Sequence, residues 1–576
     1  MESALQLALR SSWQATAGVS ALLAVLSHHV VFRPYEIDGA AWELVFGYIG
    51  SCVALFFLYI LVAGYSFLTA VGRTLLVSSS YNVTLLISIL VYRAFFHRLR
   101  GFPGPFNARL SRFYAFSKVA KTVRGCEDVQ KLHEQYGDFV RIVSDEVAQT
   151  LTDLCKGPRE ISINRPGAIR PIYEPPTRTT RSPWYAQVSN DVTKISINST
   201  RVLKVHKQRK KGWERGLGSR AMAVYEPRVA SKVDSLLDRL AAHAGNPIDM
   251  TKYIMFFGFD VMGDIGLSKD FHMVEREVED PAIQGVHESM FAIGVFGTVP
   301  WLLSMLGKIP GAAGGYNKYT KWCHDELQEK RQILLSEMAS LKDQEPRDIM
   351  TWLLKAKEQG DPCAPPGDLA IEEDARLLII AGSDTVASAI TNALFYLTKN
   401  QTVYKTLQAT LAKEFPGGDS EWTYEKARNI PYLDWVIQET LRLRPSVPGG
   451  LARVTPPEGL MVDGTFIPGD TVTSVPTYTI QRDERYWPDA LSFKPERWEG
   501  LSTEKAPWLP FTRGQWACSG RAVAMMEMRM VLGRIALHYD LSFPPPVTPE
   551  TAEFVFQDTF TQTLPPLPLV FTPRND

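Results

Sequence analysis

Net charge is the first thing that this sequence lacks, because 62 lysine and arginine side chains are balanced by 62 aspartates and glutamates. A balanced chain has no field of one sign to attract a polyanion, so a nucleic-acid-binding role is unsupported. Cysteine is scarce as well: 576 residues contain six, and no two of them form a C-x-x-C pair. That spacing predicts neither a zinc site nor a disulfide framework, and we expect reduced thiols that face the cytosol. No nicotinamide or flavin fingerprint is present either.

Apolar residues are concentrated at the N-terminus, in three stretches: Gly18 to Phe32, Trp42 to Phe67, and Leu75 to Phe96. The second stretch is the surest membrane span, because it holds a long run without a charge and a hydrocarbon core takes about 20 residues to cross. Polar residues interrupt the other two stretches, so the sequence predicts between one and three transmembrane segments. A cleaved signal peptide is disfavoured, since the apolar material continues well beyond one h-region.

Basic residues follow the last apolar stretch, and by the positive-inside rule they place everything downstream in the cytoplasm. They are Arg93, Arg98, Arg100, Arg109 and Arg112. The segment Gly101-Phe-Pro-Gly-Pro105 then breaks any helix, because its prolines and glycines cannot sustain backbone hydrogen bonding. We therefore expect a membrane anchor over residues 1–100 and a catalytic domain over 101–576, on the cytosolic face of the endoplasmic reticulum.

The ten residues FTRGQWACSG, from Phe511 to Gly520, precede a helical pattern and hold the most informative cysteine. Cys518 is placed where a loop passes into a helix, and the free N–H groups and helix dipole there favour a thiolate. Gly514 and Gly520 flank it where a flat macrocycle would need the backbone to come close, since glycine has no Cβ. Phe511 could pack on the face of such a ring. A lone cysteine is usually a buried structural residue, but this frame favours an iron ligand.

This stretch resembles the haem-ligating loop of the cytochrome P450 family, and the resemblance extends from about Phe102 to the end of the chain. It implies a mainly helical (α+β) domain with small β-sheets, the cytochrome P450 fold, behind N-terminal transmembrane helices. It also implies haem b as the cofactor, with Cys518 as the axial ligand of the iron. Dioxygen and an apolar molecule would be the substrates, and NADPH electrons would arrive through a separate NADPH-cytochrome P450 reductase. Length alone would favour about three domains, but the resemblance implies one large domain after the membrane anchor.

A proline-free apolar segment, Glu372 to Asn400, predicts a long helix through the core, with AGSDT at its middle. Gly382 lowers helix stability there, and Thr385 can bond back to the Ala381 carbonyl, so we expect a local opening that forms a groove. Burying Asp384 is costly unless it has a task or a partner. A kink in a core helix would be the plainer interpretation of the motif alone. By resemblance, Asp384 and Thr385 are catalytic and relay protons to bound dioxygen.

A second helical segment, Leu433 to Arg444, places Glu439 and Arg442 on one face at positions i and i+3. On a surface such a pair would contribute a few tenths of a kcal/mol. The resemblance to the family's E-x-x-R motif implies instead a buried network that is joined by Arg497 of FKPERW. A guanidinium can hold two partners at once, which suits that role.

Three residues are expected to hold the haem propionates: Lys210 and Trp213 of HKQRKKGWERG, and Arg453. For the basic run the plainer interpretation is a solvated surface. The family usually has a basic residue two positions before the cysteine, and here that residue is Trp516. The remaining three would then share its work, or Arg513 would contribute from another angle. Trp516 is still counted among the cofactor-binding residues, as some fungal members carry an aromatic residue here.

Residues 142–156 form an insertion that the family pattern does not contain, and it is either a surface loop or an unremoved intron. The resemblance to fungal secondary-metabolism members implies the oxidation of an apolar natural product, such as an indole alkaloid, terpenoid or polyketide. One rival function is that of an isomerase or dehydratase that rearranges a peroxide without dioxygen, although such enzymes often lack the Asp and Thr pair. Two further rivals are a membrane transporter or scaffold, and a haem sensor that never turns over.

Overall fold

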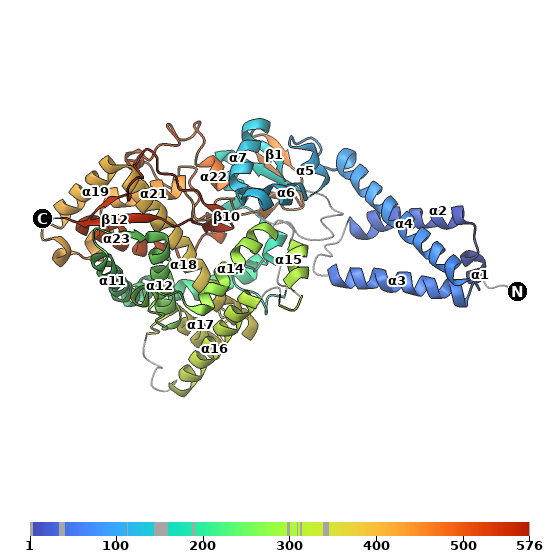
Figure 1. Ribbon diagram of the computed structural model, residues 1–576, viewed down its shortest axis with the longest axis horizontal. Helices are drawn as coiled ribbons and strands as arrows, with labels where there is room; N and C mark the ends of the chain where they lie inside the picture. The colour runs from blue at the N-terminus through green and yellow to red at the C-terminus, as the bar shows by residue number, and fades with distance from the viewer. Residues whose placement is uncertain are drawn as a thin grey trace.

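The structure of the protein is a computed structural model that describes residues 4–33, 41–111, 113–142, 159–186, 191–296, 300–307, 309–311, 314–337 and 345–574. Figure 1 shows a large helical body with three long helices that project from one side as an arm. The insertion predicted at 142–156 lies outside the described residues, apart from Ile142 at the end of the first strand.

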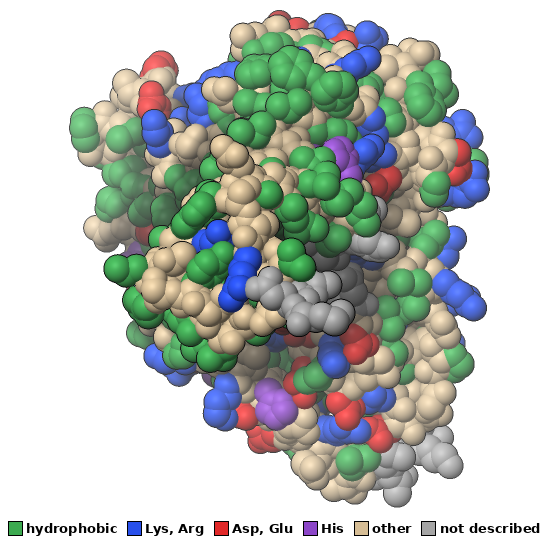
Figure 2. Space-filling model, turned by 90° about the vertical axis from the view of Figure 1, so that its right-hand side faces the viewer, with side chains coloured by type: hydrophobic (Ala, Val, Ile, Leu, Met, Phe, Trp, Pro, Cys, Tyr) green, Lys and Arg blue, Asp and Glu red, His purple; other side chains and the backbone are tan. Residues whose placement is uncertain are grey.

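The projecting arm consists of the N-terminal apolar stretches, which fold as α1 (Ala4–Leu9), α2 (Trp13–Leu26), α3 (Ala41–Leu61) and α4 (Phe67–Val91). Short π-helical turns extend α2 to Phe32 and α4 to Phe96. Viewed from the arm's end, the molecule presents hydrophobic side chains gathered over the near helices (Figure 2). On the arm, Leu22, Leu61 and Leu68 are mostly exposed although they are apolar. A surface of this kind is suited to lipid rather than to water.

Three segments of the arm are long and apolar enough to cross a membrane: Trp13–Phe32, Trp42–Leu61 and Phe67–Phe96. The first and third begin earlier than the sequence predicted, and polar residues inside both segments are satisfied between the helices. Ser20 donates to the Val77 carbonyl at 2.7 Å, and Ser80 donates to the Ala17 carbonyl at 2.9 Å. Since polar groups that bond between helices cost little in lipid, they do not end a span.

The helical body contains the other helices, and they confirm the mainly helical fold. They are α5 (Phe106–Leu110), α6 (Phe113–Thr122), α7 (Gly125–Tyr136), α9 (Ile169–Tyr173), α10 (Leu203–Gly216), α11 (Ser219–Ala242), α12 (Met250–Leu267), α13 (Met273–Arg276), α14 (Pro281–Phe296), α15 (Pro300–Gly307), α16 (Gly314–Glu337), α17 (Ile349–Glu358), α18 (Asp368–Lys399), α19 (Gln401–Glu414), α20 (Tyr424–Ala427), α21 (Pro431–Leu443), α22 (Thr477–Ile480) and α23 (Arg521–His538).

The described strands form small sheets at the side of the helices. One sheet has the order β1-β2-β8-β5-β3 and another the order β4-β12-β9, and β6-β7 and β10-β11 are hairpins. The strands are β1 (Phe139–Ile142), β2 (Glu160–Ile163), β3 (Thr180–Arg181), β4 (Pro247–Asp249), β5 (Arg453–Val454), β6 (Leu460–Val462), β7 (Thr465–Ile467), β8 (Val472–Ser474), β9 (Tyr539–Ser542), β10 (Gln557–Thr559), β11 (Thr561–Thr563) and β12 (Pro568–Pro573). Because the strands are short and the helices are long, the helices form the core.

Helix α18 is the centre of that core, and its middle packs against α12 (Figure 1). A Cβ on Gly382 would come within 2.4 Å of the Met262 sulfur, so glycine at this position permits the close approach of the two helices. The expected opening of the helix at AGSDT does not occur, because α18 is continuous from Asp368 to Lys399. Gly382 therefore serves helix packing, where the sequence had predicted a break.

Candidate active site

The Cys518 loop is a compact turn that ends at the first residue of α23. The Cys518 N–H donates to the Phe511 carbonyl at 3.0 Å, and Gly520 is the N-cap of the helix. The Cys518 side chain is exposed although Trp516 and Val523 close by are buried. The backbone thus presents the sulfur at the start of a core helix and leaves it uncovered.

Opposing effects act on the pKa of Cys518. Desolvation by the protein around the thiol raises its pKa, and the N–H groups of Gly520 and Arg521 and the charge of Lys210 oppose that rise without overcoming it. A cation at the sulfur is what would favour the charged form, since metal binding deprotonates a coordinating thiol.

The two glycines near Cys518 have different reasons to be glycine. Gly514 has a φ of +68°, and a Cβ there would meet the Tyr173 carbonyl oxygen at 2.1 Å. Glycine here therefore lets the loop cross the backbone beside α9, and the room that it would leave for a macrocycle stays a prediction. At Gly520 a Cβ would meet only the Cys518 sulfur, at 3.9 Å. The Phe511 ring carries the guanidinium of Arg521 at 5.5 Å.

One face of α18 remains accessible inside the core, and it includes the AGSDT motif. Ala381 is exposed, and Asp384 and Thr385 are half-buried, whereas Val386, Ala389 and Ile390 on other faces are buried. These exposed positions recur at the spacing of one helix face. Thr385 Oγ1 donates to the Ala381 carbonyl at 2.8 Å, as the sequence predicted. An accessible stripe on a core helix indicates an internal space in front of Ala381 and Thr385.

Three buried nitrogen-bearing side chains gather around the indole of Trp516. The guanidinium of Arg181 lies 4.3 Å from the ring centroid, that of Arg453 lies 6.0 Å away, and the His206 ring is at 4.1 Å. Arg181 and Arg453 donate to backbone carbonyls, but the Nε atoms of both and Nη2 of Arg453 have no partner among the described residues. His206 Nδ1 and Trp516 Nε1 are also unpaired. We call these four residues the Trp516 cluster.

No described carboxylate contacts either arginine of the Trp516 cluster. Burial lowers the pKa of Arg181 to about 9, and the nearby charges of Arg453 and Arg209 add to that effect. Burial and the same cations depress the pKa of His206 far below its usual 6.5. Two buried cations and several unused donors require a bound anion, because unpaired buried charge is costly. The sequence reasoning missed Arg181 and His206, although His206 begins the basic segment that it did single out.

Two of the predicted propionate contacts are engaged elsewhere. The Trp213 indole N–H donates to Asp374 at 3.4 Å, in a buried group where Arg209 also binds that carboxylate at 2.8 Å. Arg513 Nη2 donates to the Thr503 carbonyl at 2.7 Å, and Nη1 lies 3.3 Å from Glu174. The expectation for Trp213 and the possible contribution of Arg513 are thus not supported by the geometry. Lys210 does reach the loop, since its Nζ lies 3.3 Å from the Ala517 carbonyl.

Glu439 and Arg442 lie on α21, where both are fully buried and joined by two hydrogen bonds of 2.8 and 2.9 Å. Arg497 Nε donates to the same carboxylate at 2.9 Å, and the Trp498 indole does so at 3.1 Å. Arg442 also donates to three backbone carbonyls, at Gln481, Ala490 and Ser492. The three residues that the sequence grouped together are therefore in contact, and every charge in the group has a partner.

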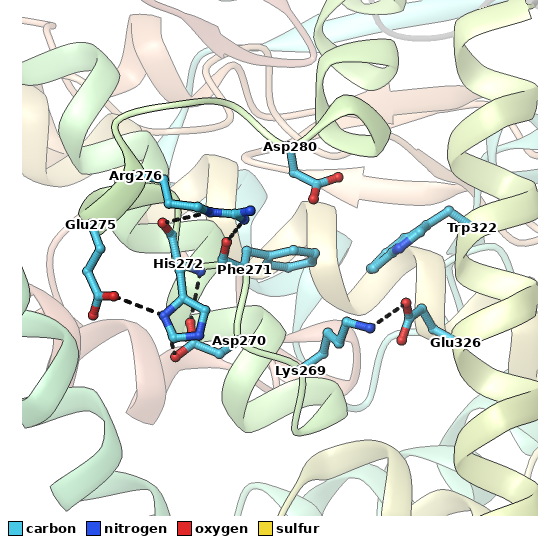
Figure 3. Close-up of a pocket in the computed structure, with 9 residues that line it drawn as sticks. All are labelled: Lys269, Asp270, Phe271, His272, Glu275, Arg276, Asp280, Trp322 and Glu326. Atoms are coloured by element: carbon cyan, nitrogen blue, oxygen red, sulfur yellow. Dashed lines mark hydrogen bonds and ion pairs between the residues drawn. The ribbon is translucent and has the colours of Figure 1, made fainter.

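A surface hollow of about 620 Å³ lies away from these groups, between α13, the turn before it and α16 (Figure 3). Its charged side chains are already paired with one another: Lys269 Nζ lies 2.9 Å from Glu326, and His272 Nδ1 lies 3.1 Å from Glu275. The Arg276 guanidinium binds the backbone carbonyls of Phe271 and His272. We therefore place the active site at Cys518 and α18, where donors and an exposed sulfur remain unused.

Comparison with known proteins decides the family. A sequence model described as Cytochrome P450 matches residues 104–569. The chain belongs to the cytochrome P450 family. It is 32% identical over 564 residues to the cytochrome P450 monooxygenase FCK2 of Fusarium pseudograminearum, covering 96% of this chain and 97% of that protein.

Of two further relatives, one is a monooxygenase by name and the other is a hydroxylase by name. The cytochrome P450 monooxygenase eupD of a Phoma species is 49% identical over 285 residues, which is 50% of this chain and all of that protein. The tryprostatin B 6-hydroxylase of Aspergillus fumigatus is 30% identical over 475 residues, covering 81% of this chain and 80% of that protein. This P450 is accordingly a monooxygenase, and its relatives are enzymes of fungal secondary metabolism.

The family implies haem, and the residues of this P450 fit that group. Its Cys518 sulfur is exposed, α18 has an accessible stripe, and the Trp516 cluster offers unpaired cationic donors of the kind that carboxylates accept. Cys518 would ligate the iron, and Arg453, Arg181 and His206 would hold the propionates. When bound, haem supplies an iron that activates dioxygen so that one oxygen atom enters the substrate.

Proposed function

We propose that this P450 binds haem b through Cys518 and hydroxylates or otherwise oxidises an apolar natural product. The Trp516 cluster is the observation that supports this most directly, because buried arginines without a carboxylate call for a dianionic ligand beside the exposed sulfur. Substitution of Cys518 by serine tests it. The reduced protein with carbon monoxide should absorb near ~450 nm, as haem-thiolate proteins do, and Cys518→Ser should lose that band. A variant that kept the band would contradict the assignment.

We propose that Thr385 and Asp384 deliver protons during oxygen activation. Thr385 Oγ1 has one hydrogen bond, to Ala381, and lies on the accessible stripe of α18. Thr385→Val removes the hydroxyl and keeps the volume, so haem content should survive while reducing equivalents leak to hydrogen peroxide. General acids typically contribute ~100-fold or more, so the loss of product per NADPH should be large. Unchanged coupling would return AGSDT to the role of a packing motif and would favour the peroxide-rearranging isomerase or dehydratase.

The substrate class rests on the relatives. One of them is named for hydroxylating tryprostatin B, and we propose a medium-sized apolar natural product, such as an indole alkaloid, terpenoid or polyketide, for this chain. The test is to delete the gene and feed the compound that accumulates to the full-length enzyme with reductase, NADPH and ¹⁸O₂. One labelled oxygen in the product is expected for a monooxygenase. Product that forms without the label would favour the isomerase or dehydratase.

We propose that electrons come from NADPH-cytochrome P450 reductase and that the enzyme resides in the endoplasmic reticulum membrane. Residues 1–100 would be the anchor and 101–576 the catalytic domain in the cytoplasm, in keeping with the basic residues that follow α4. Alkaline carbonate should leave the chain in the membrane fraction, since apolar burial does not depend on pH. A protease added to sealed microsomes should remove the catalytic domain, and full protection of the domain would place it on the lumenal side.

A further inference from the structure

His287, on α14, connects two carboxylates from different parts of the body. Its Nδ1 binds Glu279, in the segment before α14, and its Nε2 lies 3.7 Å from Asp384 Oδ1 on α18. The Phe259 ring of α12 packs edge-on against the imidazole, with centroids 5.5 Å apart. The three polar side chains thus form one line from the AGSDT motif outward.

Exposure increases along this line, which gives it a direction. The side chains of Asp384, His287 and Glu279 are 11%, 26% and 28% exposed. Asp280, the residue after Glu279, lines the surface hollow of Figure 3. The outer end of the line is therefore its more exposed end, and the inner end lies beside Thr385.

The charge on His287 suits a group held between two acids. Burial lowers the pKa of His287, but the negative charges of Asp384 and Glu279 and the hydrogen bond to Glu279 outweigh that effect and raise the pKa to about 9. Of the described groups in contact with the ring, Phe259 is uncharged and the two carboxylates are acidic. The imidazole is thus protonated on both nitrogens at neutral pH and points a proton at each acid.

We propose that His287 is the positioning residue of a proton path that runs from bulk water through Glu279 and the imidazole to Asp384. In each passage Nε2 gives its proton to Asp384 Oδ1, which leaves a neutral ring that keeps its Nδ1 proton. That ring then turns so that the vacant Nε2 takes a proton from Glu279, and water reprotonates Glu279. One proton moves inward and no electron moves. The 3.7 Å gap is too long for a hydrogen bond, so a small ring rotation or one bridging water completes it. The inference rests on the proposed role of Asp384 in proton delivery.

The test uses the full-length enzyme with reductase and NADPH and without added substrate, so that no substrate need be known. Reduced dioxygen then leaves either as hydrogen peroxide, with one NADPH per dioxygen, or as two waters, with two NADPH. Breaking the O–O bond requires proton delivery, so His287→Gln and Glu279→Gln should each raise the peroxide share severalfold. Because both lie on one path, the double variant should leak no more than His287→Gln alone.

The matched control is His324→Gln. His324 on α16 also pairs with a carboxylate of α18, Glu372, at 3.0 Å, but that pair lies outside the AGSDT motif. The His324→Gln variant should keep the wild-type share of hydrogen peroxide. If Asp384→Asn leaks and His287→Gln does not, the path through His287 is excluded and the role of Asp384 stands. If Asp384→Asn does not leak, the proposed role of Asp384 fails. A silent Glu279→Gln beside a leaking His287→Gln would reduce His287 to a tether between helices.

A second measurement needs no turnover. Because the folded pKa of His287 is raised from 6.5 to about 9, its pairing contributes stability that is present in full below pH 6.5 and is lost as pH rises through about 9. The difference in Tm between wild type and His287→Gln should therefore shrink between pH 7 and pH 10. A Tm difference that stays constant with pH would show that the imidazole is not charged, and this would contradict the proposed path.

Discussion

Two groups of buried arginines differ in whether a carboxylate of the chain itself neutralises their charge. Arg442 and Arg497 share the carboxylate of Glu439, and their other donors reach backbone carbonyls. Arg181 and Arg453 are buried to a similar degree, yet no described carboxylate contacts them and several of their N–H groups are unused. The first group is complete without a ligand and therefore stabilises the fold. The second is incomplete, and it is where we propose that the haem propionates bind.

The largest effect is expected from breaking the complete group. Glu439→Ala leaves Arg442 buried without its partner, and such a loss costs ~3–5 kcal/mol, which is a large part of the stability of a typical domain. We expect little folded, haem-loaded protein, measured as soluble yield and absorbance at the Soret band. The control is Glu425→Ala, which removes an exposed pair with the same i, i+3 spacing, at 3.0 Å from Arg428. It should cost at most about 1 kcal/mol. Equal yields from both variants would mean that burial adds nothing to the Glu439 pair.

A smaller and opposite effect on stability is expected in the incomplete group. Arg453→Leu removes a buried cation that has no partner carboxylate, so the haem-free protein should be no less stable than wild type. Haem should dissociate faster, by about tenfold or more, because a hydrogen bond to a charged group contributes ~1.5–3 kcal/mol. Transfer of haem to an excess of apomyoglobin measures the rate. Arg497→Leu serves as the control, because it removes a partner of Glu439 and should lower the stability of the fold before it affects haem dissociation. Unchanged haem transfer in Arg453→Leu would show that the Trp516 cluster does not face the cofactor.

The smallest effect is expected at a second buried carboxylate, Glu527, which can be compared with Glu439. Glu527 on α23 is fully buried like Glu439, but neither of its oxygens has a partner, and burial raises its pKa well above the usual value. A raised folded pKa means that its contribution is present in full below the unfolded value of about 4.3 and is lost as pH rises. Glu527→Gln does not titrate, so its Tm relative to wild type should increase from pH 5 to pH 8. A relative Tm that falls over that range would mean that the carboxylate is charged and paired in the folded enzyme.

Much of the site could be predicted from the sequence, because the decisive residues occur in short local patterns. The spacing of Glu439 and Arg442, the loop around Cys518 and the bond from Thr385 to Ala381 each depend on neighbours a few residues apart. The turn at Asp463-Gly464 was predictable for the same reason, and both residues have positive φ in the β6–β7 hairpin.

The rest depends on contacts between distant segments, which no local pattern records. Arg181 reaches Trp516 from a strand more than three hundred residues earlier, and His287 meets Asp384 from a different helix. Gly382 was interpreted as the place of a local opening in the helix, because the sequence does not show that its packing partner, Met262, lies on α12. Trp213 was assigned to the haem because the sequence could not place Asp374 beside it. In each case the residue type was noticed or available, and the missing information was the partner.

The arm also decides on which side of the bilayer its outer end lies. Helix α1 docks at the turn between α3 and α4, where Arg10 Nε donates to the Ala63 carbonyl at 3.0 Å, and Figure 1 shows it at the end remote from the body. The 25 residues of α4 separate that turn from the body by about 38 Å, more than the hydrocarbon thickness of about 30 Å. With the catalytic domain in the cytoplasm, as proposed above, an epitope fused ahead of α1 should become visible to antibodies only after sealed microsomes are permeabilised. An epitope at the C-terminus should be visible from the start.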